Sequence, residues 1–548
     1  MSLGLDFGTT TTVFSNAAGI VNIFGQDQLI PSVALHNPET GEWQFGKQAV
    51  DSGLNDLLIT NLKSAITLNN STLTSRDARL TFDADLVITR YLEFLANELR
   101  WDQEFGSTEV RMSCPAFWDK EQRNRLIRCA TAAGFILTGG GLLDEPVSAA
   151  VGWLEHTVSL DDKAKFFGRQ ILVFDMGGGT LDLALIRIDR KGQSENEALY
   201  RVAASCGSNM AGNAVDLGIA KKIYDFISTD VKISGVVDRN GGVKYFLPWA
   251  RDIKEALSNS KLVTWTIPVP MTDPISFSLS EKELRELLND VFDSEQLGEP
   301  IKRSVQRLLS LGYAGYASAA AEVDHPYSSF YPSAIDSILL VGGMARMPLL
   351  HEYLSTMFQQ RSGEKEPTFL PDDSEAVQEV VALGLGLPKS YMNLNLMRPD
   401  FDVVVTLFDL RQNLTLGSHV IWEAYSMPYQ ITYDPNRSAG FLFETKVINF
   451  PTPDGYDRGA VAGEISVVSY DGSPLKVQGA GGRTGLYYRL SENGKGRIKM
   501  SSSGIFTITD EGGEKTKGQL QVWPEPRIIL SNENYKPDRG NRAGDEVG

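Results

Sequence analysis

The chain contains two copies of one local pattern, and this repeat limits the folds it can adopt. Residues 3–13 read LGLDFGTTTTV and residues 171–184 read ILVFDMGGGTLDLA. Each copy has an apolar strand that ends in aspartate, a turn of glycine and threonine, and a second strand. The pattern predicts two β-hairpins with tight turns, each following a buried strand.

The residue types in the two turns suit the binding of phosphate. Glycines let backbone N–H groups approach phosphate oxygens, and threonine hydroxyls add donors. An aspartate at each strand end can hold a hydrated Mg²⁺ between the turns, because Mg²⁺ prefers carboxylates and retains water. Two unrelated hairpins are the alternative, but the paired pattern favours a clamp on one polyphosphate. The candidate residues are Asp6, Gly8, Thr9, Thr10, Asp175, Gly177, Gly178, Gly179 and Thr180.

A third glycine turn follows a third apolar run, at Gly342 and Gly343. This turn leads into a predicted helix, an arrangement that suits the phosphate or ribose side of a nucleotide. The guanidinium of Arg346 can stack on a purine face. Taken alone, the segment is more typical of a plain turn between a strand and a helix.

Two further residues are candidates for phosphoryl chemistry. Glu145 stands just before Pro146, a residue that suits the first turn of a helix. The glutamate is either a capping residue or a group that orients an attacking water. Lys63 can neutralise charge on a transferring phosphoryl group, although a single lysine is ordinarily a solvated surface residue.

The pattern of apolar residues divides the chain into two parts. Up to residue 392, strands and helices alternate; strands are expected at 2–7, 11–18, 109–114, 171–174 and 335–341, and helices at 84–103, 119–133, 346–360 and 373–386. After a short acidic and apolar linker, residues 393–405, the chain alternates in period two over 406–530. Turn dipeptides at 454–455, 471–472 and 512–513 predict an antiparallel β domain there, and residues 531–548 a flexible tail.

Composition excludes several classes of partner. The 69 acidic against 52 basic residues give a net charge of −17, which disfavours nucleic acid or anionic membrane as the main partner. The three cysteines form no CxxC pair, so we expect neither a disulfide framework nor a zinc site. We expect a reduced, cytoplasmic protein. No signal peptide or membrane span is expected.

Together these motifs resemble the nucleotide-binding domain of the seventy-kilodalton heat-shock (DnaK-type) chaperones, within the actin-like ATPase superfamily. The resemblance covers about the first 390 residues in the family's order. It includes the segment Cys114–Arg123, which is similar to the family's interlobe switch. The resemblance implies an α/β fold, namely a two-lobed actin-like (duplicated ribonuclease-H-like) ATPase domain at 1–392 followed by an all-β domain.

The resemblance also implies roles for individual residues. Asp6, Lys63, Glu145, Asp175 and Thr180 would surround the γ-phosphate, Mg²⁺ and the attacking water, with Asp6 and Asp175 holding the metal through waters. Gly212 would lie near the ribose and phosphate, and Lys254 and Ser258 would bind the adenosine. Pro115 and Arg123 would relay the nucleotide state between the lobes. Arg251 and Glu255 depart from the family pattern by an apparent exchange of charge, and Met210-Ala211 departs from its usual Leu-Gly.

The implied function is that of an ATP-hydrolysing chaperone with ATP or ADP and Mg²⁺ as cofactors. Its partners would be an unfolded or specific client, with a possible co-chaperone or nucleotide-exchange factor. Little chain follows the last expected strand, so the β domain would lack the family's helical lid. Four alternatives remain open: an actin-like filament or scaffold, a remodelling ATPase with a dedicated partner, a kinase of a small metabolite, and an interaction protein whose site has decayed.

Two other glycine-rich segments are interpreted as loops. Residues 41–48 have the spacing of a Walker A loop up to Lys47, but no Ser or Thr follows and no helix is expected to open there. Residues 479–485 have the wrong spacing for a dinucleotide-binding loop.

Overall fold

A computed structural model of the chain describes residues 3–23, 27–101, 108–137, 142–190, 197–228, 235–238, 241–269, 273–296, 299–319, 335–359, 367–370, 379–387, 401–409, 411–426, 429–433, 441–445, 448–449, 461–469, 476–478, 485–489, 497–500, 505–509, 515–521 and 527–531. Packing divides the chain into two units. The first contains Met1–Gly312 and Tyr331–Asn393, and the second contains Tyr313–Phe330 and Leu394–Gly548.

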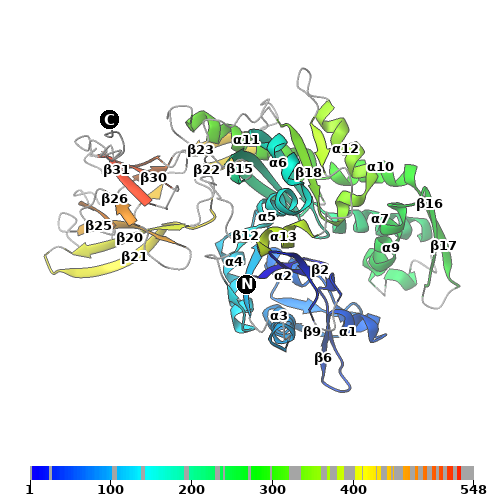
Figure 1. Ribbon diagram of the computed structural model, residues 1–548. Helices are drawn as coiled ribbons and strands as arrows, with labels where there is room; N and C mark the ends of the chain where they lie inside the picture. Colours follow the sequence, from blue (N-terminus) through cyan, green and yellow to red (C-terminus); the bar gives the residue numbers. More distant parts are fainter. Residues whose placement is uncertain are drawn as a thin grey trace. The chain divides into compact units, whose positions relative to one another are not determined.

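Two β-sheets of the same design organise the first unit (Figure 1). The first has the order β11-β10-β1-β2-β3 and the second the order β15-β14-β13-β18-β19. In each sheet the strand carrying the repeated aspartate, β1 or β13, is antiparallel to the next strand and parallel to a later one. The repeat therefore extends from the two turns to two whole sheets.

The strands of these sheets follow the apolar runs of the sequence. In the first sheet they are β1 (Leu3–Phe7), β2 (Thr11–Asn16), β3 (Gly19–Val21), β10 (Glu109–Cys114) and β11 (Ile136–Leu137), with β4 (Ile30–Pro31) beside β2 and β12 (Leu143–Asp144) beside β10. In the second they are β13 (Arg169–Met176), β14 (Leu181–Arg190), β15 (Ala198–Ser208), β18 (Ser337–Val341) and β19 (Thr368–Leu370).

Helices α2 (Leu62–Thr67), α3 (Ala84–Trp101) and α4 (Lys120–Ala132) cover the first sheet and share its core. The start of α4 is fixed by a capping box between Asp119 and Gln122. Its end is fixed by Gly134, whose φ of +91° favours glycine. Peripheral elements are β5 (Ala34–His36), β6 (Trp43–Phe45), α1 (Gly46–Asp51), η1 (Asn55–Leu57), β7 (Leu58–Ile59), β8 (Thr72–Thr74) and β9 (Thr81–Asp83).

The second lobe carries helices on both sides of its sheet and a separate hairpin. The helical elements are η2 (Trp153–Thr157), α6 (Leu160–Lys163), η3 (Ala164–Phe166), α7 (Gly212–Ile227), η4 (Gly242–Phe246), α9 (Leu247–Leu257), α10 (Glu281–Phe292), α11 (Ile301–Ala319), η5 (Gly343–Arg346) and α12 (Pro348–Gln359). The hairpin is β16 (Leu262–Ile267) with β17 (Ile275–Ser280).

Two short helices, α5 (Glu145–Gly152) and α13 (Val380–Gly386), pack against each other through small residues (Figure 1). A Cβ at Gly152 would lie 1.9 Å from the Val380 carbonyl oxygen, and one at Gly384 would lie 2.0 Å from the Ser148 carbonyl oxygen. On its other side α13 contacts β1 and β2, where a Cβ at Gly4 would lie 2.5 Å from the Gly386 nitrogen. These glycines let α13 lie between α5 and the first sheet.

We predict that Gly152→Ala lowers the free energy of unfolding of the first unit by about 2–3 kcal/mol, because the methyl group overlaps a backbone oxygen that packing holds in place. Urea unfolding followed by tryptophan fluorescence measures the change. The control is Gly235→Ala, because among the described residues, chain neighbours aside, no atom lies within 4 Å of a Cβ at Gly235. Equal stability of both variants would show that the α5–α13 contact is loosely packed.

The described residues of the second unit beyond residue 400 are strands and turns. The strands are β20 (Phe401–Asp409), β21 (Leu414–Trp422), β22 (Tyr429–Tyr433), β23 (Phe441–Thr445), β24 (Ile448–Asn449), β25 (Val461–Ser469), β26 (Lys476–Gln478), β27 (Gly485–Arg489), β28 (Arg497–Met500), β29 (Ile505–Thr509), β30 (Lys515–Gln521) and β31 (Arg527–Ser531). All pairs are antiparallel except β26 with β31, which is parallel.

The structure differs from two local expectations. Residues 401–405, expected to end a linker, pair along β25 as the start of β20, and the Asp402 carboxylate accepts the Ala424 N–H at 2.7 Å. Helix α1 opens at Gly46, where no helix was expected; residues 43–45 are strand β6, so no phosphate loop forms there. The expected turns at 454–455, 471–472 and 512–513, most of the 479–485 loop, residues 393–400 and the 532–548 tail lie outside the described residues.

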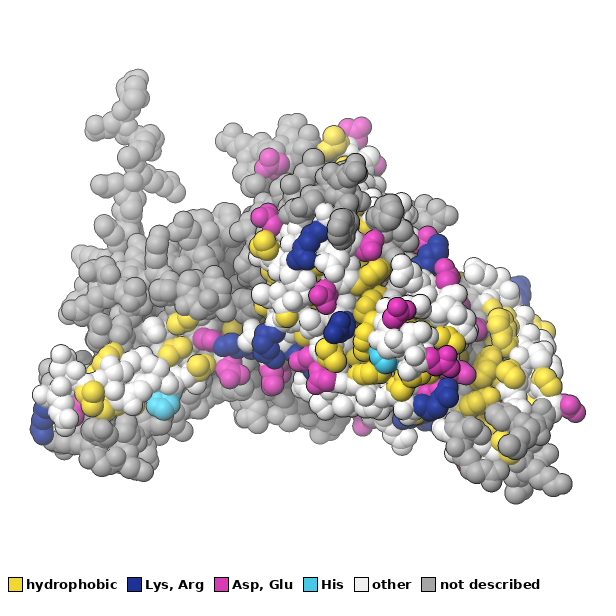
Figure 2. Space-filling view, turned by 90° about the horizontal axis from the view of Figure 1, so that it is seen from below, with side chains coloured by type: hydrophobic (Ala, Val, Ile, Leu, Met, Phe, Trp, Pro, Cys, Tyr) yellow, Lys and Arg dark blue, Asp and Glu magenta, His cyan; other side chains and the backbone are white. Residues whose placement is uncertain are grey.

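Two further observations concern the surface of the described residues. None of their helices combines the length and the apolar character needed to cross a bilayer. On the face of the molecule seen in Figure 2, Lys and Arg side chains are interspersed with Asp and Glu and form no continuous basic area.

Candidate functional site

The two repeated turns have the same internal geometry. The Gly8 N–H donates to the Thr11 carbonyl at 3.0 Å, and the Gly177 N–H donates to the Thr180 carbonyl at 3.0 Å. In both, the aspartate stands two residues before the bonded glycine, at Asp6 and Asp175. The turns therefore place an aspartate and the closing hydrogen bond at equivalent positions, while Thr9 and Thr10 of the first turn correspond to Gly178 and Gly179 of the second.

The two turns lie against each other. A Cβ added at Gly178 would lie 2.8 Å from the Thr10 Oγ1, and one added at Gly179 would lie 2.8 Å from the Thr9 Oγ1. The same position at Gly179 lies 3.2 Å from the Ser64 Oγ, next to Lys63 on α2. The structure thus places both predicted phosphate turns and the lysine helix at one point, where only glycine leaves room for the threonine hydroxyls.

Two more predicted glycines adjoin the second turn. Gly342 has a φ of +85°, and a Cβ there would lie 2.7 Å from the Asp175 Oδ1. At the N-terminus of α7, the Gly212 N–H donates to the Gly177 carbonyl at 3.1 Å and the Asn213 N–H donates to the Gly178 carbonyl at 2.7 Å. The second turn is consequently held by a neighbouring helix end and by the third glycine turn.

Behind the turns, one buried lysine meets several carboxylates. Lys63 and Glu145 form an ion pair, with 2% and 6% of the residues exposed. Asp6 accepts a hydrogen bond from the Ser113 hydroxyl at 2.9 Å. Asp182 accepts one from the Ala116 N–H at 2.6 Å. Four carboxylates, including Asp175, thus surround a single ammonium group.

Burial raises the pKa of every carboxyl in the group. Burial, with the neighbouring Asp182 and Asp6, raises the pKa of Asp175 to about 8. Burial raises the pKa of Asp182 to about 6, although the Lys63 ammonium opposes it, and it also raises the pKa of Glu145 and Asp6. Burial alone would lower the pKa of Lys63, but the carboxylates of Glu145, Asp6 and Asp182 raise it.

The donor set fits a magnesium ion bound through water. Asp182 Oδ2 is buried and has no hydrogen-bond partner among the described residues. Within that same part of the chain, no group of three or more His, Cys, Asp or Glu side chains converges closely enough to hold a metal directly. Mg²⁺ tolerates this arrangement, because it keeps several waters and needs only one or two protein carboxylates.

The segment Cys114–Arg123 forms hydrogen bonds with this group of carboxylates and with its neighbour Asp144. Arg123 donates to the Asp144 carboxylate at 2.7 Å, and only 2% of the arginine is exposed. Asp144 immediately precedes Glu145, and the Ala116 N–H that binds Asp182 follows Pro115. The Pro115 carbonyl accepts the Trp118 N–H at 3.1 Å, which closes the turn.

The predicted adenosine residues on α9 have partners within the protein. Lys254 pairs with Asp216 at 2.7 Å and donates to the Gly212 carbonyl at 3.4 Å, so it lies beside the second turn. The Ser258 hydroxyl donates to the Lys254 carbonyl at 3.3 Å. The two residues that depart from the family pattern, Arg251 and Glu255, form a surface ion pair with each other at 3.2 Å.

The remaining predicted residues and a missed one complete the site. Gly343 and Arg346 are exposed at the ends of η5. Asp182 was not among the sequence candidates, yet it pairs with Asp175 across the hairpin, where the first copy has Val13 opposite Asp6. Aligning the two copies places Asp182 at the Val13 position, and that comparison is the signal that identifies it.

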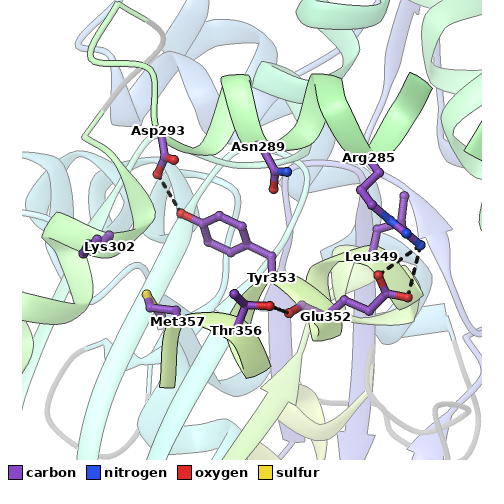
Figure 3. A pocket seen from close by; sticks show the side chains of 9 residues that line it. All are labelled: Arg285, Asn289, Asp293, Lys302, Leu349, Glu352, Tyr353, Thr356 and Met357. Atoms are coloured by element: carbon purple, nitrogen blue, oxygen red, sulfur yellow. Dashed lines mark hydrogen bonds and ion pairs between the residues drawn. The ribbon is translucent and has the colours of Figure 1, made fainter. Parts of the chain in front are cut away.

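A cavity of about 360 Å³ between α10, α12 and the start of α11 shares no residue with these turns (Figure 3). Its charged groups largely satisfy one another. Tyr353 donates to Asp293 at 2.8 Å, and Arg285 pairs with Glu352 at 3.0 Å. The lining residues include two cations and two carboxylates, so this cavity has no surplus charge for a polyphosphate.

We predict that Asp175→Asn raises the melting temperature of the protein in magnesium-free buffer at pH 8. The carboxyl has a pKa of about 8 in the fold against 3.8 in a free chain, so the fold binds its proton more tightly than the unfolded chain does. The stability that this carboxyl contributes is therefore complete below about pH 4 and is lost as the pH rises toward 8.

Thermal unfolding at pH 5 and pH 8 measures this effect, with an expected gain of about 3–6 °C at pH 8 and a smaller gain at pH 5. Asp161→Asn, at an exposed position, is the control. A larger gain at pH 5 than at pH 8 would contradict the electrostatic account.

Comparison with protein families identifies a match that covers the second glycine–threonine turn and the residues around it. The family model described as "Hsp70 protein" matches residues 67–386, which is more than half of the chain. The matched range includes Glu145, Asp175 and Asp182 and begins after the first turn and Lys63.

Curated relatives match a longer part of the chain at low identity. The chaperone protein DnaK of Thermosipho africanus (strain TCF52B) is 26% identical over 393 residues, 68% of this chain and 57% of its own length. That of Thermosipho melanesiensis is 25% identical over 391 residues, with the same coverage of 68% and 57%. That of Halobacterium salinarum is 25% identical over 395 residues, 70% of this chain and 55% of its own length. The chain thus spans little more than half the length of these relatives.

Proposed function

Because the chain belongs to the Hsp70 protein family, whose domain has the two-lobed actin-like ATPase fold, we propose that it is an ATP-hydrolysing chaperone. Its first unit would bind ATP and Mg²⁺ and its second unit would bind a client protein. The observation that carries the proposal is the contact between the two glycine–threonine turns in front of the Lys63–Glu145 pair. DnaK relatives named as chaperones support the assignment.

The phosphates would lie between the two turns. Backbone N–H groups of Gly8–Thr10 and Gly177–Thr180 and the threonine hydroxyls would donate to phosphate oxygens. Mg²⁺, held through waters by Asp6 and Asp175, would supply charge neutralisation for the phosphates. The Thr9 and Thr10 hydroxyls lie close to Gly179 and Gly178, so a triphosphate bound there would contact both turns at once.

Hydrolysis would use the pair behind the turns. A water would attack the γ-phosphorus, and the bond to the β,γ-bridging oxygen would break. Glu145 would orient this water and accept its proton, a role that its raised pKa favours. Lys63 would offset the charge on the transferring phosphoryl group, and Thr180 would position it from the second turn.

The adenosine would bind beside the second turn. Gly212 and Lys254 adjoin that turn, while Gly342 and Gly343 provide close backbone approach and Arg346 a planar group for the purine. Ser258 would have to exchange its bond to the Lys254 carbonyl for one to the nucleotide.

Nucleotide state would reach the second unit through the interlobe segment. Arg123 is bound to Asp144, next to Glu145, and Pro115 precedes the amide that binds Asp182. A change at the γ-phosphate would therefore move this segment. ATP can shift such an equilibrium only by its difference in affinity for the two states, typically about 1–3 kcal/mol.

The second unit would bind clients through its β-strands, in a cytoplasmic chaperone. Co-chaperones and a nucleotide-exchange factor are the further partners that the family membership suggests.

We predict that Glu145→Gln abolishes ATP turnover but leaves ATP binding within about threefold of wild type, because a group that orients water contributes mainly to the transition state. Steady-state ATPase assays and calorimetric titration with Mg-ATP measure the two quantities. The control is Glu155→Gln, which breaks an ion pair with Lys163 outside the turns. Unchanged turnover in Glu145→Gln would remove this residue from the mechanism.

A second prediction concerns the output. A fluorescein-labelled, permanently unfolded protein bound to the chain should dissociate at least about tenfold faster with Mg-ATP than with Mg-ADP, which at an equal association rate corresponds to a coupling of about 1.4 kcal/mol. Stopped-flow anisotropy measures the rates. Dissociation that ignores nucleotide would contradict the chaperone function while leaving the ATPase assignment intact.

A further inference from the structure

We propose that Arg307, on α11, is a positioning residue for the nucleotide site, acting through Gly207 on Asp182 and on the second turn. This inference rests on the proposed ATPase function and adds to it a residue that contacts neither phosphate turn. No sequence motif points to Arg307, since its role depends on which strand α11 packs against.

Arg307 makes two strong contacts. Its Nη2 donates to the Gly207 carbonyl at 2.6 Å and pairs with the Glu299 carboxylate at 2.8 Å. A charged donor to a carbonyl oxygen is shorter and stronger than a neutral one, so this bond fixes the end of β15 in position. Burial raises the pKa of the neighbouring Cys206 thiol to about 11, so this thiol is neutral near pH 7. The charge of the guanidinium is therefore balanced by the Glu299 carboxylate.

Gly207 in turn lies beside one of the buried carboxylates. It pairs with Asp182 across β14 and β15, and a Cβ at Gly207 would lie 3.1 Å from the Asp182 Oδ1 and 2.4 Å from the Phe117 ring. Asp182 and Phe117 therefore occupy the space that a side chain at Gly207 would fill, next to the backbone that Arg307 holds. A shift of Gly207 would move both the carboxylate and the interlobe segment.

A short segment connects Gly207 to the start of α7, which contacts the second turn. β15 ends at Ser208, and α7 begins at Gly212, whose N–H binds the Gly177 carbonyl. The Ser208 hydroxyl accepts the Met210 N–H at 3.3 Å within this connection. The bond from Arg307 thus anchors the start of the segment that supports Gly177 and Gly178.

Packing alone does not account for an arginine at this position. Its Nε is buried without a hydrogen-bond partner among the described residues, and buried ion pairs are often no more stabilising than apolar side chains of similar size. The specific gain is a directed bond to one carbonyl oxygen. This bond fixes the position of Gly207 and of the residues beside it. A small displacement of residues that position the reacting groups lowers kcat more than it weakens substrate binding.

The test compares Arg307→Met with Arg303→Met, one turn away on the same helix, where Arg303 pairs with an exposed Glu295. We expect kcat for ATP to fall about tenfold in Arg307→Met with KM within about twofold, and no change in either for Arg303→Met. Arg307→Lys should recover most of kcat, because its ammonium can still donate to the Gly207 carbonyl. Since Arg307→Met leaves Glu299 unpaired, Arg307→Met/Glu299→Gln provides a second folded variant with the same expected loss.

A readout without turnover separates this inference from the proposed function. Amide hydrogen exchange over residues 203–215 should be faster in Arg307→Met than in wild type or Arg303→Met, without an equal change across the rest of the first unit. Wild-type protein without ATPase activity would contradict the proposed function, and the exchange result would still decide the anchoring. Unchanged kcat in an active enzyme, or unchanged exchange in this segment, would overturn the role of Arg307.

Discussion

The structure depends on one contact, in which the Thr9 and Thr10 hydroxyls lie against the glycines of the opposite turn. Each turn follows a strand of a separate sheet, so the contact joins two lobes of equal design at the ends of β1 and β13. Side chains at Gly178 or Gly179 would separate the turns. The same absence of side chains exposes backbone N–H groups, and this links the architecture to phosphate binding.

The buried charges behind this contact are unbalanced when all of the carboxyls are ionised. Four buried carboxyls lie near one lysine, and burial raises the pKa of each of them. A site of this kind is unstable when fully ionised and gains from a divalent cation carrying phosphate. The energy of binding the cation and phosphate is then available to close the lobes. The ion pair of Arg123 with Asp144 lies next to Glu145, within the carboxylate group whose charge balance would change most.

Much of the fold and the site follows from local patterns in the sequence. Asp119 and Gly134 mark the ends of α4, and the two glycine–threonine turns form as the sequence predicts. Features that depend on register or on packing between distant segments do not follow from local pattern. Asp182 lies opposite Asp175 because of the register of β13 and β14, and Arg307 reaches the Gly207 carbonyl because α11 lies against β15. Residues 401–405 form a strand because β25 supplies hydrogen bonds.

The central claim is that both turns bind one triphosphate. Calorimetric titration with Mg-ATP of wild type, Thr10→Val and Gly178→Val tests it most directly. The account predicts one ATP per chain and affinity at least about tenfold weaker in each variant, because each loses contacts to the same phosphates. Two independent sites, or wild-type affinity in either variant, would contradict it.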